Sequence, residues 1–120
     1  MTFISYAQNF EDVLLWRALG HIKHGFYIDV GANDPVEHSV TKAFYDAGWR
    51  GINVEPLPAF HQEFLQQRPR DVNLAVAAGS ADGSLTLYDI PLVNGWASPA
   101  PAVAEAHRAV GFEVSELTVP

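Results

Sequence analysis

The fold of this chain is decided by one stretch, Gly25-Phe26-Tyr27-Ile28-Asp29-Val30-Gly31-Ala32-Asn33-Asp34-Pro35. Residues 26–30 are mostly aromatic or β-branched and follow a glycine, which is typical of a buried strand. The strand ends abruptly in residues 31–35, whose Gly, Asn, Asp and Pro favour a sharp turn. A helical pattern follows the turn, so this stretch predicts the first strand of a parallel β–α–β fold.

The same alternation continues downstream. Val40, Ala43, Phe44 and Ala47 share one face of a helix that we expect to begin near Glu37 or His38 and to end at Gly48. The order then predicts a strand at 51–55, a helix stopped by Pro69 and a strand at 72–78. Strand–helix–strand–helix–strand indicates a parallel sheet with right-handed crossovers and flanking helices, which is a Rossmann-like α/β fold.

The flanking segments complete one predicted domain over residues 1–120. Ser5-Tyr6-Ala7-Gln8 has the form of a capping box and predicts an N-terminal helix at about 7–20, within a segment 1–24. Residues 25–78 form the predicted βαβαβ core. Residues 79–120 predict a strand at 85–90 paired in a hairpin, a Pro-rich loop, a short helix from Pro101 and a last strand at 112–119.

Composition excludes several classes of function. The net charge of −7 and the absence of any Lys/Arg run argue against nucleic acid as a partner, because phosphate binding needs clustered positive charge. The chain has no cysteine, so it has no disulfide and no thiolate metal site. It has no apolar run near the roughly 20 residues that span a bilayer, and no secretion signal. We therefore expect a cytoplasmic protein without a membrane partner.

Ligands of parallel sheets bind at the carboxyl ends of the strands. Gly31 follows the first strand directly and would let backbone approach a ligand, and Asn33 and Asp34 add polar side chains able to hold an ammonium or hydroxyl group. The alternative is a tight turn that needs these residues for its dihedral angles alone. His38, just beyond the turn, could be a general base or simply the first polar residue of a helix.

Glu55 ends the second strand, 24 residues after Gly31. A carboxylate at this spacing can accept hydrogen bonds from both hydroxyls of an adenosine ribose, and the alternative is a solvated glutamate. The dinucleotide pattern G-x-G-x-x-G keeps only its first glycine here, and Asp34 would repel a pyrophosphate. These residues suit S-adenosylmethionine better than NAD, and so favour methyl transfer over hydride transfer.

The sequence resembles the FkbM family of S-adenosylmethionine-dependent methyltransferases. The resemblance lies in Ser5-Tyr6-Ala7-Gln8-Asn9-Phe10-Glu11-Asp12, Gly25-Phe26-Tyr27-Ile28-Asp29-Val30-Gly31-Ala32-Asn33, Gly51-Ile52-Asn53-Val54-Glu55-Pro56, Asn73-Leu74-Ala75-Val76-Ala77-Ala78 and the segment around Gly83. It implies a class I methyltransferase fold, S-adenosylmethionine as cofactor, and O-methylation of a hydroxyl on a sugar or secondary metabolite, so a small-molecule or glycan acceptor.

The resemblance also implies the cofactor-binding residues. They are Asp29, Gly31, Ala32, Asn33 and Asp34 around the first strand end, Glu55 and Pro56 at the second, and Ala77 near the adenine. It assigns no catalytic residue, and the five histidines form no metal-ligand pair at helical spacing, so no metal is expected.

The chain departs from the family pattern in one respect. The family continues with a fourth parallel strand of the type Lys-Ile-Asp-Val-Glu-Gly, and no such segment occurs here. We therefore expect a fold that is incomplete at its C-terminus, with the edge of its first strand exposed. A homo-oligomer or a complementing chain could cover that edge. The alternative function is a non-catalytic S-adenosylmethionine-binding or interaction module that needs a partner chain.

Overall fold

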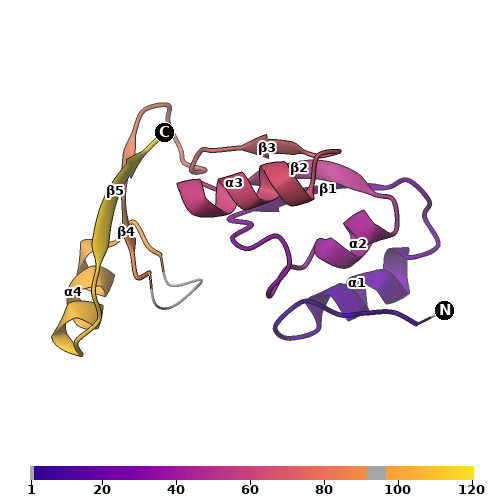
Figure 1. Ribbon diagram of the computed structural model, residues 1–120, viewed down its shortest axis with the longest axis horizontal. Helices are drawn as coiled ribbons and strands as arrows, with labels where there is room; N and C mark the ends of the chain where they lie inside the picture. The colour runs from indigo at the N-terminus through magenta and orange to yellow at the C-terminus, as the bar shows by residue number, and fades with distance from the viewer. Residues whose placement is uncertain (1, 92–96) are drawn as a thin grey trace. The chain divides into compact units, whose positions relative to one another are not determined.

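The computed structural model describes residues 2–91 and 97–120, and the chain divides into two compact units, one ending at Ala75 and one beginning at Val76 (Figure 1). The first unit contains a three-stranded sheet and three helices. These elements are α1 (Glu11–Leu19), β1 (Phe26–Val30), α2 (Lys42–Asp46), β2 (Arg50–Val54), α3 (Pro58–Gln67) and β3 (Val72–Leu74). Within the described ranges, no helix is both long and apolar enough to cross a membrane.

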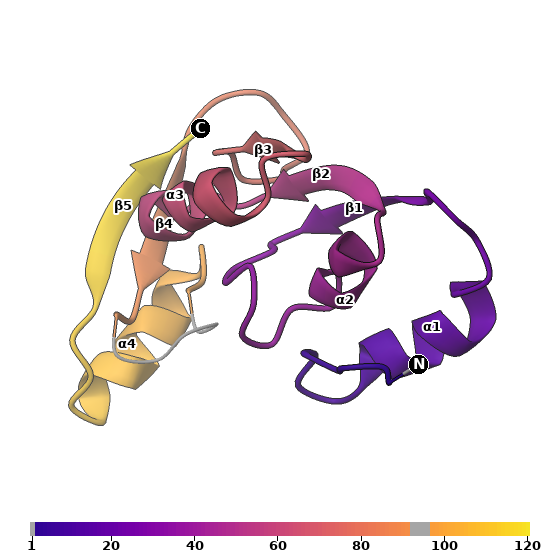
Figure 2. The same ribbon diagram turned by 45° about the vertical axis from the view of Figure 1, so that its right-hand side comes forward.

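The sheet has the order β1-β2-β3, and both pairs of strands are parallel, which confirms the predicted alternation. Parallel strands joined by helices require crossovers, and α2 and α3 supply them on the same side of the sheet (Figure 2). The predicted third strand at 72–78 is shorter in the structure, because its pairing with β2 ends at Leu74. The carboxyl ends of β1 and β2 lie side by side, with Val30 opposite Val54.

The two faces of this sheet differ in character. One face carries a polar row, Asp29, Asn53 and Asn73, at matching register positions of the three strands, and α2 and α3 cover it. The opposite face carries apolar side chains that remain exposed, namely Phe26, Ile28, Val30, Val72 and Leu74. Parallel sheets are normally covered on both faces, so this open apolar face is a distinctive feature of the unit.

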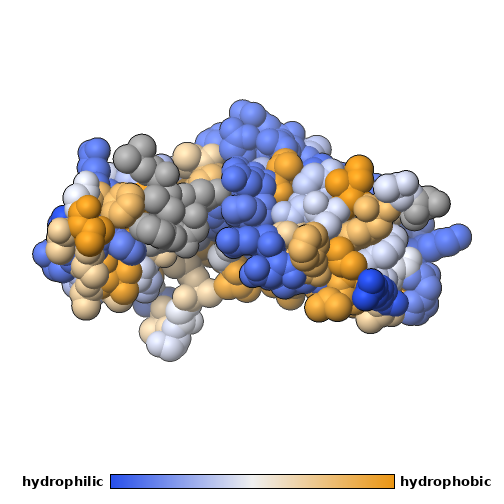
Figure 3. Space-filling view, turned by 90° about the horizontal axis from the view of Figure 1, so that it is seen from below, coloured by the Kyte–Doolittle hydropathy of each residue, from blue (hydrophilic) through white to orange (hydrophobic). Residues whose placement is uncertain are grey.

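Aromatic packing joins α1 to α2. The ring of Trp16 lies 5.4 Å from that of Phe44, and Phe44 meets Trp49 edge-on at 4.9 Å. The other side of α1 is unpacked, because Leu14 and Leu15 are exposed. On the face shown in Figure 3, apolar side chains in orange lie among hydrophilic ones in blue.

The N-terminal helix begins later than the capping box predicts. It starts at Glu11, not near residue 7, and Ser5 does not cap it. Instead, the buried carboxylate of Asp12 accepts hydrogen bonds from Ser5 Oγ at 2.6 Å and from the backbone N–H groups of Tyr6 at 2.8 Å and Ala7 at 3.2 Å. Burial raises the pKa of Asp12, but these hydrogen bonds outweigh it and leave the pKa below its usual value.

Helix α2 also begins later than predicted. It starts at Lys42, whereas we expected a start near Glu37 or His38, and it is only five residues long. The segment before it is a loop in which His38 adopts the left-handed conformation, with φ 59°. Ser39 Oγ accepts hydrogen bonds from the N–H groups of Thr41 and Lys42, and this turn delays the helix.

The second unit contains β4 (Leu85–Asp89), α4 (Pro101–Ala109) and β5 (Ser115–Val119). The prediction of a hairpin for the strand at 85–90 is wrong, because β4 pairs antiparallel with β5, from which α4 separates it in sequence. The helix opens at Pro101, as predicted. Residues 92–96 of the predicted Pro-rich loop lie outside the described residues.

Candidate functional site

The turn after β1 bends across the end of β2. The N–H groups of Gly31 and Ala32 both donate to the carbonyl of Val54, at 2.8 and 3.2 Å. Gly31 and Asn33 hold the left-handed conformation, with φ 68° and 61°, which glycine and asparagine tolerate best. A Cβ built on Gly31 would meet no atom within 4 Å, so open space lies directly above this backbone.

Glu55 links the two strand ends. Its Oε1 accepts a hydrogen bond from the N–H of Asn33 at 2.8 Å, and its Oε2 accepts one from the N–H of Leu57 at 2.7 Å. The side chain is not the solvated glutamate of the alternative interpretation, because Glu55 is only 4% exposed. Its carboxylate therefore fixes the turn after β1 against the start of α3, and Pro56 between them is half-buried.

Asp34 serves the local turn. Its Oδ1 accepts hydrogen bonds from the N–H groups of Val36 at 2.8 Å and Glu37 at 2.9 Å. This arrangement supports the turn interpretation for Asp34 while leaving the residue half-buried beside Asn33. His38, the candidate base, is exposed further along the same loop.

Asp29 belongs to the polar row beneath this loop. Its Oδ2 accepts a hydrogen bond from Thr41 Oγ1 at 2.8 Å. Burial raises the pKa of Asp29, and the Thr41 hydrogen bond and the nearby Arg68 charge oppose that rise only in part. Asp29 thus lies below the turn and supports it through Thr41.

Arg68 is the main residue that the sequence analysis missed. Its side chain is fully buried, and its guanidinium donates to Pro35 O, Ser39 Oγ and Thr41 Oγ1 at 2.7–2.8 Å. It also stacks near the rings of Phe64 and Tyr45, with centroids 5.1 and 5.5 Å away. In sequence, Arg68 precedes the helix-stopping Pro69 and looks like an ordinary surface residue at a helix end.

Asp71 is the acidic counterpart of Arg68. Its carboxylate lies 3.9 Å from Arg68 Nη1 and accepts hydrogen bonds from Gly51 N–H and Asn53 Nδ2, each at 2.9 Å, and from the Tyr27 hydroxyl. Burial and the hydrogen bond to Asp71 raise the pKa of Tyr27 well above its usual value.

The sequence contains one signal of the polar row on the covered face of the three-stranded sheet. Each strand of that sheet has a polar residue one position before its end, namely Asp29, Asn53 or Asn73.

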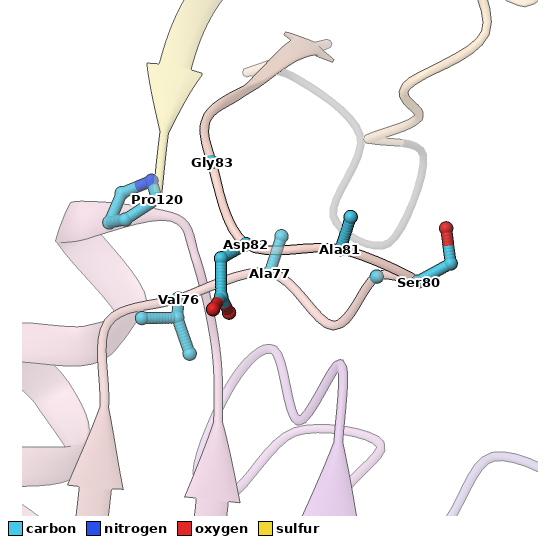
Figure 4. Close-up of a pocket in the computed structure, with 8 residues that line it drawn as sticks. Val76, Ala77, Ser80, Ala81, Asp82, Gly83 and Pro120 are labelled. Carbon is cyan, nitrogen blue, oxygen red and sulfur yellow. The ribbon is translucent and has the colours of Figure 1, made fainter.

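Ala77 lies in the second unit. Its N–H donates to the carbonyl of Pro120 at 2.7 Å, and it lines an open hollow of about 600 Å³ with Val76, Asp82 and Gly83. Figure 4 shows the Asp82 carboxylate extending toward Val76 in this hollow. The predicted adenine-side residue therefore borders a concave surface of its own unit.

The arrangement at the ends of β1 and β2 suits a cationic or hydroxyl-bearing ligand. The backbone above Gly31 is open, and the same turn carries Asn33, whose N–H donates to Glu55, and then Asp34. In the part of the chain that the structure describes, no cluster of His, Asp or Glu could hold a metal ion.

Comparison with known proteins gives one family. A family model described as Methyltransferase FkbM domain matches residues 29–120, which is most of the chain and includes both strand ends. No curated protein and no solved structure matches the chain significantly.

Proposed function

Because this chain belongs to the FkbM methyltransferase family and is thus an S-adenosylmethionine-dependent methyltransferase, we propose that its acceptor is a hydroxyl group of a sugar or secondary metabolite. The acceptor class rests on the resemblance to the family, and the geometry supports the cofactor site, because open space above Gly31 lies at one strand end and the Glu55 carboxylate lies at the next. This is where ligands bind on parallel sheets.

The residues present fit the cofactor. Gly31 leaves room for the methionine end, with Ala32 beside it in the turn, and Asn33 and Asp34 offer polar groups to its ammonium. Glu55 would accept hydrogen bonds from the ribose diol, with Pro56 shaping the loop behind it and Asp29 supporting the turn from below. The resemblance to the family implies that Ala77 contacts the adenine, and this assignment stays a prediction.

When bound, S-adenosylmethionine supplies a sulfonium methyl group that an acceptor oxygen can displace directly. The chain's own residues would contribute by orientation, because the turn at Gly31 and Asn33, which is hydrogen-bonded to Val54 and Glu55, would hold the methionine end. Aligning two reactants can supply a large part of the reduction in barrier. The carboxylates of Asp34 and Glu55 at this turn also favour a cationic ligand over a pyrophosphate.

Calorimetric titration tests the proposal. The purified chain is titrated with S-adenosylhomocysteine and, in parallel, with NAD. We expect binding of the first ligand only, and methyl transfer from labelled S-adenosylmethionine to at least one sugar or polyol in a panel of hydroxyl acceptors. Binding of NAD, or transfer only to acceptors without a hydroxyl, would contradict the proposal.

A second candidate function follows from the open apolar face of the sheet. We propose that a second copy of this chain covers this face and the outer edge of β1, in which case the unit is an interaction module. The supporting observation is that Phe26, Ile28 and Val30 are each about 60% exposed on a strand with one described neighbour. Light scattering of the purified chain tests this candidate, since a strict monomer with full cofactor binding would contradict it.

A further inference from the structure

We infer that Arg68 is a positioning residue that sets the geometry of the cofactor loop, residues 31–41. The inference rests on the proposed function, because it assumes that this loop receives the methionine end of S-adenosylmethionine. Arg68 itself lies at the end of α3 and is fully buried, so it acts on a ligand only through the loop.

The guanidinium contacts the loop at three separate points. Nη2 donates to the carbonyl of Pro35 and to Ser39 Oγ, both at 2.8 Å, and Nη1 donates to Thr41 Oγ1 at 2.7 Å. Thr41 in turn links Arg68 to β1, because the Thr41 hydroxyl also donates a hydrogen bond to Asp29. A planar group with fixed donor directions can hold such divergent acceptors, whereas a lysine ammonium is a single point of charge.

The loop is therefore held by two charged groups from different elements. Glu55, at the end of β2, fixes its first half through the N–H of Asn33. Arg68 fixes its second half, from Pro35 to Thr41. Between these points Asp34 closes a local turn with Val36 and Glu37. Loss of Arg68 would release the second half while leaving the bonds of Glu55 intact.

The chain offers a matched control for this inference. Arg70 is two residues away, carries the same charge, and contacts the carbonyl and ring of Tyr45 in α2 rather than the loop. Arg70→Gln therefore removes a neighbouring guanidinium without touching residues 31–41. Trp49→Phe provides a second control, because Trp49 packs against Phe44 and its substitution lowers stability at a site away from the loop.

The test measures affinity for S-adenosylhomocysteine, KM and kcat for S-adenosylmethionine, and amide hydrogen exchange over residues 31–41. We expect Arg68→Gln to weaken binding at least tenfold, to raise KM more than it lowers kcat, and to speed exchange in the loop. Arg68→Lys should restore affinity only in part. Thr41→Val, which keeps Arg68 and the side-chain shape, should weaken binding in the same direction and serves if Arg68→Gln does not fold.

The outcomes separate the two proposals. If the wild-type chain fails to bind S-adenosylhomocysteine, the proposed function fails and the inference falls with it. If the wild type binds but the Arg68 and Thr41 variants bind equally well, the proposed function stands and the inference is overturned. It is also overturned if Arg70→Gln or Trp49→Phe weakens binding as much as Arg68→Gln, because the effect would then follow stability rather than the loop.

Discussion

Replacing Glu55 by glutamine separates its role in the fold from its role in binding. The carboxylate accepts two short hydrogen bonds from backbone N–H groups, at 2.8 Å from Asn33 and 2.7 Å from Leu57, in a site that is 4% exposed. A hydrogen bond to a charged group contributes about 1.5–3 kcal/mol. Glutamine keeps one acceptor oxygen and turns an NH₂ group toward the other N–H, so we expect a loss of about 1.5–3 kcal/mol in unfolding free energy.

The same substitution predicts a loss of affinity. A ribose diol needs two acceptor oxygens, and glutamine offers one, so S-adenosylhomocysteine should bind roughly 10- to 150-fold more weakly, as one charged hydrogen bond of this strength implies. Urea unfolding followed by tryptophan fluorescence measures the first effect, and calorimetry measures the second. Glu63→Gln on the exposed side of α3 is the control and should change stability by less than about 0.5 kcal/mol.

Two results would refute this reasoning. If Glu55→Gln unfolded at the same midpoint urea concentration as the wild type, the hydrogen bonds from the Asn33 and Leu57 N–H groups to Glu55 would contribute nothing to stability. Wild-type affinity in a variant that is measurably destabilised would mean that Glu55 fixes the loop without contacting the ribose.

Three further predictions address the turn, the open sheet face and the N-terminal carboxylate. Gly31→Ala should lower the unfolding free energy measured in urea by about 1–2 kcal/mol, because φ 68° is unfavourable for alanine. It should also weaken S-adenosylhomocysteine binding, because the added methyl group enters the open space above residue 31. Unchanged affinity in calorimetry would place the ligand elsewhere. Ile28→Thr should change stability by less than about 0.5 kcal/mol if the sheet face is open in solution, since Ile28 is 63% exposed, whereas a loss above about 1 kcal/mol would support the covered face of the second candidate function. The pKa of Asp12 is lowered in the folded chain, so the stabilisation that Asp12 provides is fully present above its unfolded pKa of about 3.9 and is lost as pH falls through the folded pKa. The difference in unfolding free energy between wild type and Asp12→Asn should therefore shrink from pH 6 to pH 3. A difference that stays constant over this range would contradict the prediction.

The parallel sheet could be predicted from sequence because the segments 26–30, 51–55 and 72–78 are rich in apolar residues, have a glycine or proline at an end, and alternate with helical patterns. The boundaries of α1 and α2 could not, and both errors have the same origin. Ser5 and Ser39 are helix-capping residue types, but Ser5 donates to Asp12 and Ser39 builds a turn before Lys42. Local side-chain hydrogen bonds compete with helix formation, and sequence spacing does not show which arrangement wins.

The candidate site was predictable only in part. Gly31, Asn33 and Glu55 follow from the rule that ligands bind at strand ends, and the structure brings Asn33 and Glu55 into contact. Arg68 was not predictable, because its partners Pro35 and Thr41 are about thirty residues away in sequence and meet it only after α3 packs on the sheet. The pairing of β4 with β5 was missed for a related reason, since antiparallel partners separated by α4 leave no local turn signal.

The polar row of Asp29, Asn53 and Asn73 also determines which sheet can form. Side chains alternate between faces, so a slip of one residue in any strand would carry its polar member to the opposite face. Asn53 would then lose its hydrogen bonds to Asp71 and Asn73 together, and the buried polar groups left behind would lack those partners. An apolar sheet tolerates such slips far better. The buried polar residues thus favour one strand register over misaligned ones during folding. In the folded chain, the same residues support the loop.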